Sequence, residues 1–180
     1  IPPEITSLPR DLTPEESQLL EAGTGFGLEL LRRQVERAPD STHLVSPFSA
    51  SVALGMTLNG ADGETFREMR QVLGFGELDR ETVNRAYRDL VELLVQVDPR
   101  VSFQVANSVW YRDNYTVRTP FRQAVESYFD ARVEGLDFSD AGAAGRINDW
   151  VADATRNRIT EIAPDPIPND VVAYLINALH

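Results

Sequence analysis

The sequence predicts a domain of the α+β class, and three stretches carry that prediction. Residues 46–61 contain no charge and combine a Ser-Pro start with closely spaced apolar residues, so we expect a helix that is apolar on every side and therefore buried. Residues 79–94 place apolar residues three and four apart, as an amphipathic helix does. Residues 101–111 alternate between two faces and contain β-branched and aromatic residues, which is typical of a strand.

The composition is that of an ordinary globular protein with an acidic surface. The chain has 180 residues, of which 42% are hydrophobic and 25% charged, and its formal net charge is −11. This charge argues against nucleic acid and against an anionic membrane as partners. No apolar run approaches the ~20 residues that a membrane-spanning helix needs. The absence of Cys excludes disulfide and thiol chemistry, and the 17 basic residues are all Arg.

Residues 44–65 form the stretch around which we expect the fold to be organised. Ser46 and Pro47 predict a helix start, because a Ser hydroxyl accepts a hydrogen bond from a first-turn amide and Pro at the first position needs no donor. The helix is expected to end at residues 59–63, Asn-Gly-Ala-Asp-Gly, whose residue types tolerate positive φ. A second, amphipathic helix follows and ends at Gly74.

The other elements follow from caps, prolines and spacing. Residues 1–14 contain four prolines and predict an extended lead-in. A helix capped by Thr13 should run towards Arg37, with a glycine run at residues 23–27 breaking its first half. We further expect a helix from Pro120, a strand over 131–138 and a turn over 139–145. The next predicted elements are a helix carrying Ile147, Trp150, Val151 and Ala154 and a proline-stiffened connector over 160–170. The last is a strand over 171–179 that is buried on both faces.

Several of these motifs, in this order, resemble the serpin family. The S-P-x-S start and the N-G-A-x-G-x-T turn are similar to the second and third helices of a serpin, and A-N-S-V-W-Y is similar to a strand of the central sheet. The I-N-x-W-V motif also resembles the family, with Asn157 in place of the family's Gly and Arg158 in place of its Lys. Because Asn is the next best residue for a left-handed helix end, we expect that turn to survive.

The resemblance spans most of residues 26–180 and implies a serpin-like α+β fold. In that fold, helices pack around a large mixed central β-sheet, which would be incomplete in this chain. It implies that residues 1–14 are a lead-in and that residues 15–180 form the N-terminal portion of a single serpin domain. The family's reactive-site bond has no counterpart in this sequence, so we expect a fragment that is completed by a second polypeptide, or a truncated or nicked chain.

The resemblance implies structural site residues. In serpins, the shutter is a hydrogen-bond network beneath the main sheet that governs whether two central strands part. The positions matched to the shutter are Ser46, Pro47, Ser49 and Asn177. The alternative for these residues is helix capping and a core Asn with satisfied hydrogen bonds. The positions matched to the family's helix-packing signature are Asn148, Trp150 and Thr155.

The function implied by the resemblance is inhibition of a serine protease, and in some serpins of a cysteine protease. Such an inhibitor is a suicide substrate with a metastable fold, whose cleaved reactive loop inserts into the main sheet. The implied partners are the target protease and the C-terminal remainder of the domain, acting outside the cell or in the periplasm. The alternative is a non-inhibitory serpin with a chaperone, carrier or storage role.

Other chemistry finds little support in the sequence. A hydrolase using Ser46 and His43 would need an acid that the sequence does not place, and no His, Cys or carboxylate cluster has metal-ligand spacing. We therefore expect no catalytic residue, no metal and no cofactor. No heparin site is expected either, because the arginines of residues 79–92 alternate with acidic residues. The sequon at Asn114 is attributed to chance.

Overall fold

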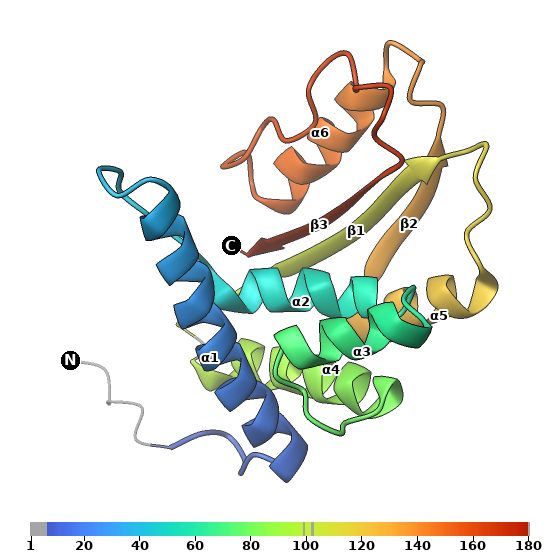
Figure 1. The fold of residues 1–180 in the computed structure, drawn as a ribbon. Helices are drawn as coiled ribbons and strands as arrows, with labels where there is room; N and C mark the ends of the chain where they lie inside the picture. The colour runs from blue at the N-terminus through green and yellow to red at the C-terminus, as the bar shows by residue number, and fades with distance from the viewer. Residues whose placement is uncertain (1–6, 99, 102, 180) are drawn as a thin grey trace. The chain divides into compact units, whose positions relative to one another are not determined.

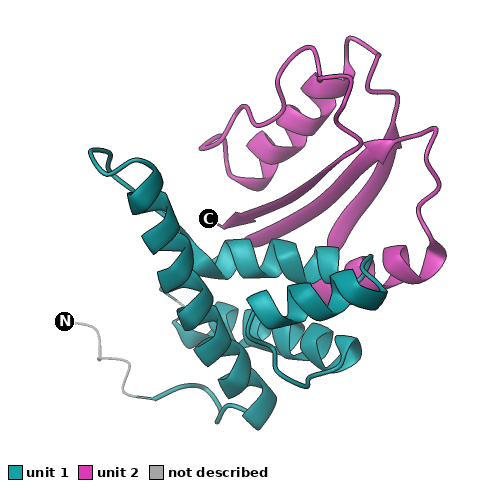
Figure 2. Cartoon of the chain, in the orientation of Figure 1, with its two compact units in different colours: residues 1–103 teal, residues 104–180 magenta. Residues whose placement is uncertain are grey.

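The computed structural model describes residues 7–98, 100–101 and 103–179, which form two compact units (Figures 1 and 2). Within the described residues, the first unit, residues 1–103, contains four helices, and the second, residues 104–180, contains a sheet and two helices. Part of the expected lead-in, residues 1–6, lies outside the described residues. The elements are α1 (Pro14–Arg37), α2 (Pro47–Leu58), α3 (Gly63–Val72), α4 (Arg80–Val97), β1 (Val105–Arg112), α5 (Thr119–Phe129), β2 (Ala131–Leu136), α6 (Ala143–Ala154) and β3 (Ala173–Leu179).

Helix α1 begins at a complete capping box. The Thr13 hydroxyl accepts from the Glu16 amide at 3.2 Å, and the Glu16 carboxylate accepts from the Thr13 amide at 2.8 Å. The expectation that glycines break this helix is wrong, because α1 is continuous to Arg37. Gly27 has a packing role: a Cβ there would lie 2.5 Å from Pro47 Cγ, so only glycine lets α1 approach the start of α2.

Helix α2 is buried on its inner side, where Val52 and Met56 are almost fully excluded from solvent, but Ala53 and Leu54 are only half-buried, so burial on every side was too strong an expectation. The helix ends at Leu58, next to the turn expected over residues 59–63, in which Gly63 has a positive φ of 55° and Asn59 has right-handed helical backbone angles. The amide group of Asn59 forms a reciprocal pair with Asn84 of α4, with hydrogen bonds of 2.9 and 2.8 Å. Because both side chains are buried, this pair satisfies two amides that would otherwise be costly and fixes α2 against α4.

The sheet of the second unit has the strand order β2-β1-β3 (Figure 1). Strand β1 pairs with β2 in parallel, beginning at Asn107 opposite Ala131, and with β3 antiparallel, with Asn107 opposite Asn177. Helix α6 covers a core in which Ile147 and Val151 are fully buried together with Trp110 and Ile176.

Strand and helix boundaries differ in places from the sequence expectation. Strand β1 begins four residues later than expected, at Val105, and the turn expected over residues 139–145 already becomes helix at Ala143. On β3, Ile176 and Ala178 are buried, whereas Leu175, Asn177 and Leu179 are only half-buried. Burial on both faces was therefore too strong an expectation, because successive side chains of a strand point to opposite faces and the face that carries Leu175 and Asn177 is only half-buried.

The end of α6 confirms the expectation for Asn157. Its φ is 59°, in the left-handed region, and Arg156 before it has a φ of 50°. The Asn157 amide donates to the carbonyl oxygen of Ala152 at 2.7 Å, which closes the helix. The replacement of the family's Gly by Asn is therefore accommodated without loss of the turn.

The ion pair of Glu16 makes the stability of the first unit depend on pH. Arg10 donates to both carboxylate oxygens of Glu16, at 2.7 and 2.5 Å, and holds the pKa of Glu16 below its ordinary value. A group whose pKa is lowered by folding stabilises the fold above its unfolded pKa, and this contribution is lost as the pH falls. We expect the Glu16→Gln variant to unfold at lower urea concentration at pH 7 and to lose less stability than wild type between pH 7 and pH 4.

The matched control is Glu21→Gln, since Glu21 is exposed on the same helix. Its urea midpoint at pH 7 should stay close to that of wild type. An equal pH dependence of wild type and Glu16→Gln would contradict the assignment of this contribution to Glu16.

Candidate functional site

Asn107 and Asn177 form a polar link across the sheet. They lie directly opposite each other in the β1–β3 ladder, and Asn177 Nδ2 donates to Asn107 Oδ1 at 2.8 Å. Asn107 Nδ2 donates in turn to the carbonyl oxygen of Phe129 at 2.7 Å, at the end of α5, where helix carbonyls lack intrahelical partners. The Oδ1 atom of Asn177 is buried and has no hydrogen-bond partner among the described residues. The link thus connects β3, β1 and α5, and its buried acceptor, Asn177 Oδ1, receives no hydrogen bond from the described residues.

The other predicted shutter residues lie at the start of α2, in the first unit. Ser46 is the N-cap and its Oγ accepts from the Ser49 amide at 3.3 Å, while Pro47 is the first helical residue, as expected. Ser46 is exposed and Ser49 is half-buried. Because Asn177 belongs to the other unit, a shutter that joins it to Ser46 and Ser49 stays a prediction.

The geometry offers no catalytic pairing of Ser46 with His43. The Nε2 atom of His43 lies 2.8 Å from the carbonyl oxygen of Ala38, and the Ser46 hydroxyl is engaged in capping α2. The second histidine, His180, lies outside the described residues. Within residues 7–98, 100–101 and 103–179, no group of three or more His, Cys, Asp or Glu side chains could hold a metal ion.

Of the positions matched to the helix-packing signature, Asn148 and Thr155 hold the segment that follows α6, whereas Trp150 packs on β1. Asn148 Oδ1 accepts from the amides of Ile162 and Ala163 at 2.8 and 2.9 Å, and its Nδ2 donates to the Ala163 carbonyl at 2.9 Å. Trp150 packs edge-on against Trp110, with ring centroids 6.0 Å apart. Thr155 is buried, and its Oγ1 donates to the Val151 carbonyl at 2.8 Å and accepts from the Ile159 amide at 3.0 Å.

Arg112, at the end of β1, holds the proline-containing connector at the end that leads into β3. Its Nε donates to the Val171 carbonyl at 2.6 Å, and its Nη2 donates to the carbonyls of Pro168 and Asn169 at 3.1 and 3.2 Å. The guanidinium also lies 5.2 Å from the centroid of the Phe138 ring, within cation–π distance. The connector is therefore held by α6 at one end and by β1 at the other.

The arginines of α4 are engaged with neighbouring groups. Arg85 lies 3.5 Å from Glu81, and Arg88 lies 2.8 Å from Asp89. Arg80 donates to the Ala61 carbonyl at 2.6 Å and lies over the Phe66 ring. Of the helices that the structure describes, none combines the length and apolarity needed to span a membrane.

Element order and strand pairing define an α+β scaffold in which the predicted site residues cap helices and cross-link the sheet. A family model described as "Serpin (serine protease inhibitor)" matches residues 21–180, and the chain belongs to the serpin family. The expected family and fold class are thereby confirmed. Members of this family are generally protease inhibitors rather than enzymes.

Individual relatives agree with the family match. Iripin-2 of Ixodes ricinus is 31% identical over 92% of this chain and 43% of its own length. Intracellular coagulation inhibitor 2 of Tachypleus tridentatus is 31% identical over 86% of this chain and 38% of its own length. The structure of the thermophilic serpin tengpin in the latent state is 30% identical, with a TM-score of 0.80 over 94% of this chain and 44% of tengpin. The chain therefore spans less than half the length of each.

Two polar residues that organise these contacts were not singled out from the sequence. In the sequence, Asn107 is one residue of the alternating strand pattern over residues 101–111, and Asn84 lies within the amphipathic pattern of residues 79–94. In both cases the available signal was an amide side chain among apolar residues, which must find a partner when buried. The identity of the partner, Asn177 or Asn59, depends on pairing between distant segments.

The three hydrogen bonds of Asn148 give a local test of its role. We expect Asn148→Ala to destabilise the protein by about 2 kcal/mol, since each hydrogen bond contributes about 0.5–1.5 kcal/mol net. The amides of Ile162 and Ala163 should exchange with solvent much faster in this variant, as measured by hydrogen exchange with NMR. Asn148→Asp keeps the acceptor for both amides but places an oxygen against the Ala163 carbonyl, so the two amides should exchange more slowly than in Asn148→Ala even though the donor bond is lost.

Asp149→Ala serves as the control because Asp149 is exposed on the same helix. Its stability should change by less than about 0.5 kcal/mol. Unchanged exchange of both amides in Asn148→Ala would show that Asn148 does not hold this segment.

Proposed function

We propose that this chain is the N-terminal portion, residues 15–180, of a single serpin domain that inhibits a serine protease as a suicide substrate. The observation that carries the proposal is the family match over residues 21–180, supported by a relative named as an inhibitor, the coagulation inhibitor of Tachypleus tridentatus, at 31% identity. The reactive loop lies outside this chain, so the remainder of the domain is a necessary partner, as continuing chain or as companion polypeptide. We place the action outside the cell or in the periplasm.

In the proposed mechanism, the protease serine attacks the scissile carbonyl of the reactive loop. An ester forms between the protease and the loop, the peptide bond breaks, and the proton of the serine passes through the protease histidine to the departing amine. Hydrolysis of the ester by water would release the protease. Insertion of the cleaved loop into the main sheet prevents that step by distorting the protease, and the energy comes from a metastable starting fold.

We further propose that Ser46, Pro47, Ser49 and Asn177 form the shutter that controls sheet opening. Support comes from the Asn177–Asn107 hydrogen bond, which joins β3 to β1, and from the Ser46 cap that fixes the start of α2. The buried Oδ1 atom of Asn177 requires a donor that the described residues do not supply. In the proposed network, this donor is a histidine in the remainder of the domain.

The inhibitor proposal is tested with the whole protein and a panel of trypsin-like and subtilisin-like proteases. We expect a covalent complex that survives boiling in SDS, because the ester remains intact once the protease is distorted. Chemically inactivating the protease serine beforehand should abolish the band. Cleavage of the reactive loop without any such complex, for every protease in the panel, would favour the non-inhibitory alternative.

The shutter proposal predicts a specific kinetic defect. The Asn177→Ala variant of the whole inhibitor should associate with its protease at the wild-type rate when fresh. It should lose activity on storage several-fold faster, because one of the contacts holding the central strands closed is gone. Asn114→Ala, in an exposed turn, is the control and should age like wild type. Equal ageing of wild type and Asn177→Ala would remove Asn177 from the shutter.

A further inference from the structure

The turn after α2 contains a dipeptide with reactive covalent chemistry. Asn59 is the only asparagine of the sequence that precedes a glycine. In such a pair, the backbone nitrogen of the glycine can attack the side-chain carbonyl carbon of the asparagine, because no Cβ hinders the approach and the glycine backbone adopts the required angles easily. The question for the structure is whether Asn59 and Gly60 are free to react.

The structure holds the side chain of Asn59 in one position. Asn59 is 9% exposed, and its Nδ2 donates to the Gly55 carbonyl at 3.0 Å and to Asn84 Oδ1 at 2.9 Å. Asn59 Oδ1 accepts from Asn84 Nδ2 at 2.8 Å. Both N–H groups of the amide are thus engaged, and the side chain cannot turn towards the following backbone without losing three buried hydrogen bonds.

The attacking nitrogen is restrained as well. The Gly60 amide donates to the Thr57 carbonyl at 2.9 Å, and Asn59 has φ −66° and ψ −24°, as in a right-handed helix. The nitrogen becomes a nucleophile only after its proton is removed, and this hydrogen bond keeps the proton in place. Because Gly60 is exposed, water and base reach the nitrogen once the hydrogen bond opens.

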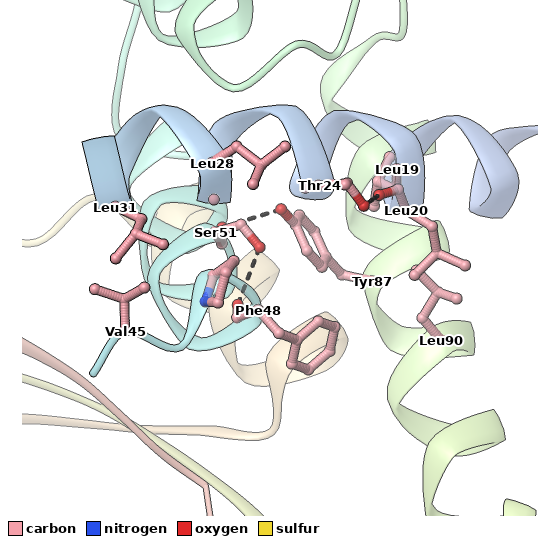
Figure 3. Close-up of a pocket in the computed structure, with 13 residues that line it drawn as sticks. Leu19, Leu20, Thr24, Leu28, Leu31, Val45, Phe48, Ser51, Tyr87 and Leu90 are labelled. Carbon is pink, nitrogen blue, oxygen red and sulfur yellow. Dashed lines mark hydrogen bonds between the residues drawn. The ribbon is translucent and has the colours of Figure 1, made fainter. Parts of the chain in front are cut away.

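The Asn59–Asn84 pair belongs to a contact between α2 and α4 that a second hydrogen bond reinforces. Tyr87 Oη donates to the Ser51 carbonyl at 3.0 Å (Figure 3). The Tyr87 ring also lies against Gly55, where a Cβ would be 2.8 Å from Tyr87 Cε2. The side chain of Asn59 is therefore released when the end of α2 separates from α4, which is a local opening of the first unit.

We propose that Asn59 is a deamidation site that its pairing with Asn84 keeps closed, and that opening of the α2–α4 contact allows an irreversible modification. In the reaction, the Gly60 nitrogen loses its proton to a base in the solvent and forms a bond to Cγ of Asn59. The bond from Cγ to Nδ2 breaks, Nδ2 takes up a proton, and ammonia leaves a five-membered succinimide. Water then opens the ring at either carbonyl carbon, so the product is aspartate or isoaspartate. Water is the only co-reactant, and the inference does not rest on the proposed inhibitory function.

The products do not restore the pair. An aspartate at position 59 carries an oxygen in place of Nδ2, and that oxygen faces the Gly55 carbonyl and Asn84 Oδ1, which are both acceptors. A buried carboxylate without donors is costly, and isoaspartate in addition inserts its side-chain methylene into the backbone. Each molecule that reacts therefore keeps a weakened α2–α4 contact, and such molecules accumulate as the protein ages.

Peptide mass spectrometry tests the proposal on the whole protein after incubation at mildly alkaline pH. Trypsin releases residues 38–67 as one peptide in which Asn59 is the only amide side chain, so the mass increase of deamidation reports this residue alone. Separation of the aspartate and isoaspartate forms of the peptide confirms the succinimide route. The peptide of residues 113–118 contains Asn114, in an exposed turn, and is the internal reference.

Folded wild type should deamidate at Asn59 at least about tenfold more slowly than the protein unfolded in guanidinium chloride, a ratio that corresponds to about 1.4 kcal/mol. The folded Asn84→Leu variant keeps a side chain of similar size but removes the partner. Its Asn59 should deamidate about tenfold faster than in folded wild type, whereas Asn114 should keep the same rate in both proteins. Adding Gly60→Ala to Asn84→Leu should suppress the reaction, because the new Cβ hinders the attack.

Three results would overturn the proposal. Equal rates at Asn59 in folded and unfolded wild type would show that the fold does not protect it, and this comparison needs no variant. A wild-type rate in folded Asn84→Leu would remove Asn84 as the restraint. Glu16→Gln weakens the same unit without touching Asn59, so equally fast deamidation in the two variants, compared at equal free energy of unfolding, would assign the reaction to global unfolding and contradict the local restraint.

Discussion

The pairing of β1 along both edges is the constraint on which the sheet unit depends. Because β2 takes one edge and β3 the other, the backbone of β1 is paired on both sides, and the polar side chains of its buried central residues must be satisfied inside the unit. Trp110 meets this requirement by donating its indole N–H to Ser108 Oγ at 2.8 Å. Asn107 meets it by bonding to Asn177 on one side and to the end of α5 on the other. The same hydrogen bonds that satisfy β1 therefore also join its neighbours to it.

The sequence predicted those features that depend on a few adjacent residues. The caps at Thr13 and Ser46, the buried inner side of α2 and the left-handed turn at Asn157 all follow from local chemistry and are observed. The predicted break in α1 is wrong because the conformational freedom of Gly27 does not interrupt the helix, and the role of Gly27 is to admit Pro47 at close range. A close approach between two helices leaves no signature in the spacing of either one.

Partner identity could not be predicted for the same reason. An amide side chain among apolar residues indicates that a hydrogen-bond partner is needed, but it does not indicate which one. The Asn59–Asn84 and Asn107–Asn177 pairs join residues that are 25 and 70 positions apart in the sequence. In the candidate site, the cap formed by Ser46 and Pro47 could be predicted locally, whereas the link from Asn177 to Asn107 required the register of β1 against β3. The Arg112 clamp was equally hidden, because its acceptors are backbone carbonyls, which carry no sequence signal at all.

The clamps on the connector bear on how the proposed inhibitor would work. Asn148 fixes residues 162 and 163 to α6, and Arg112 fixes residues 168–171 to the end of β1, immediately before β3 begins. Strand β3 is thus positioned by contacts outside its own ladder, at the end where it meets the connector. Further along, the Asn107–Asn177 pair adds a side-chain bond to the β1–β3 ladder. The side of β3 away from β1 has no strand partner among the described residues, so a strand that joins the sheet there need not disturb the clamped end. A mechanism that adds a strand to this sheet is therefore compatible with a rigid β2-β1-β3 unit that keeps its own register.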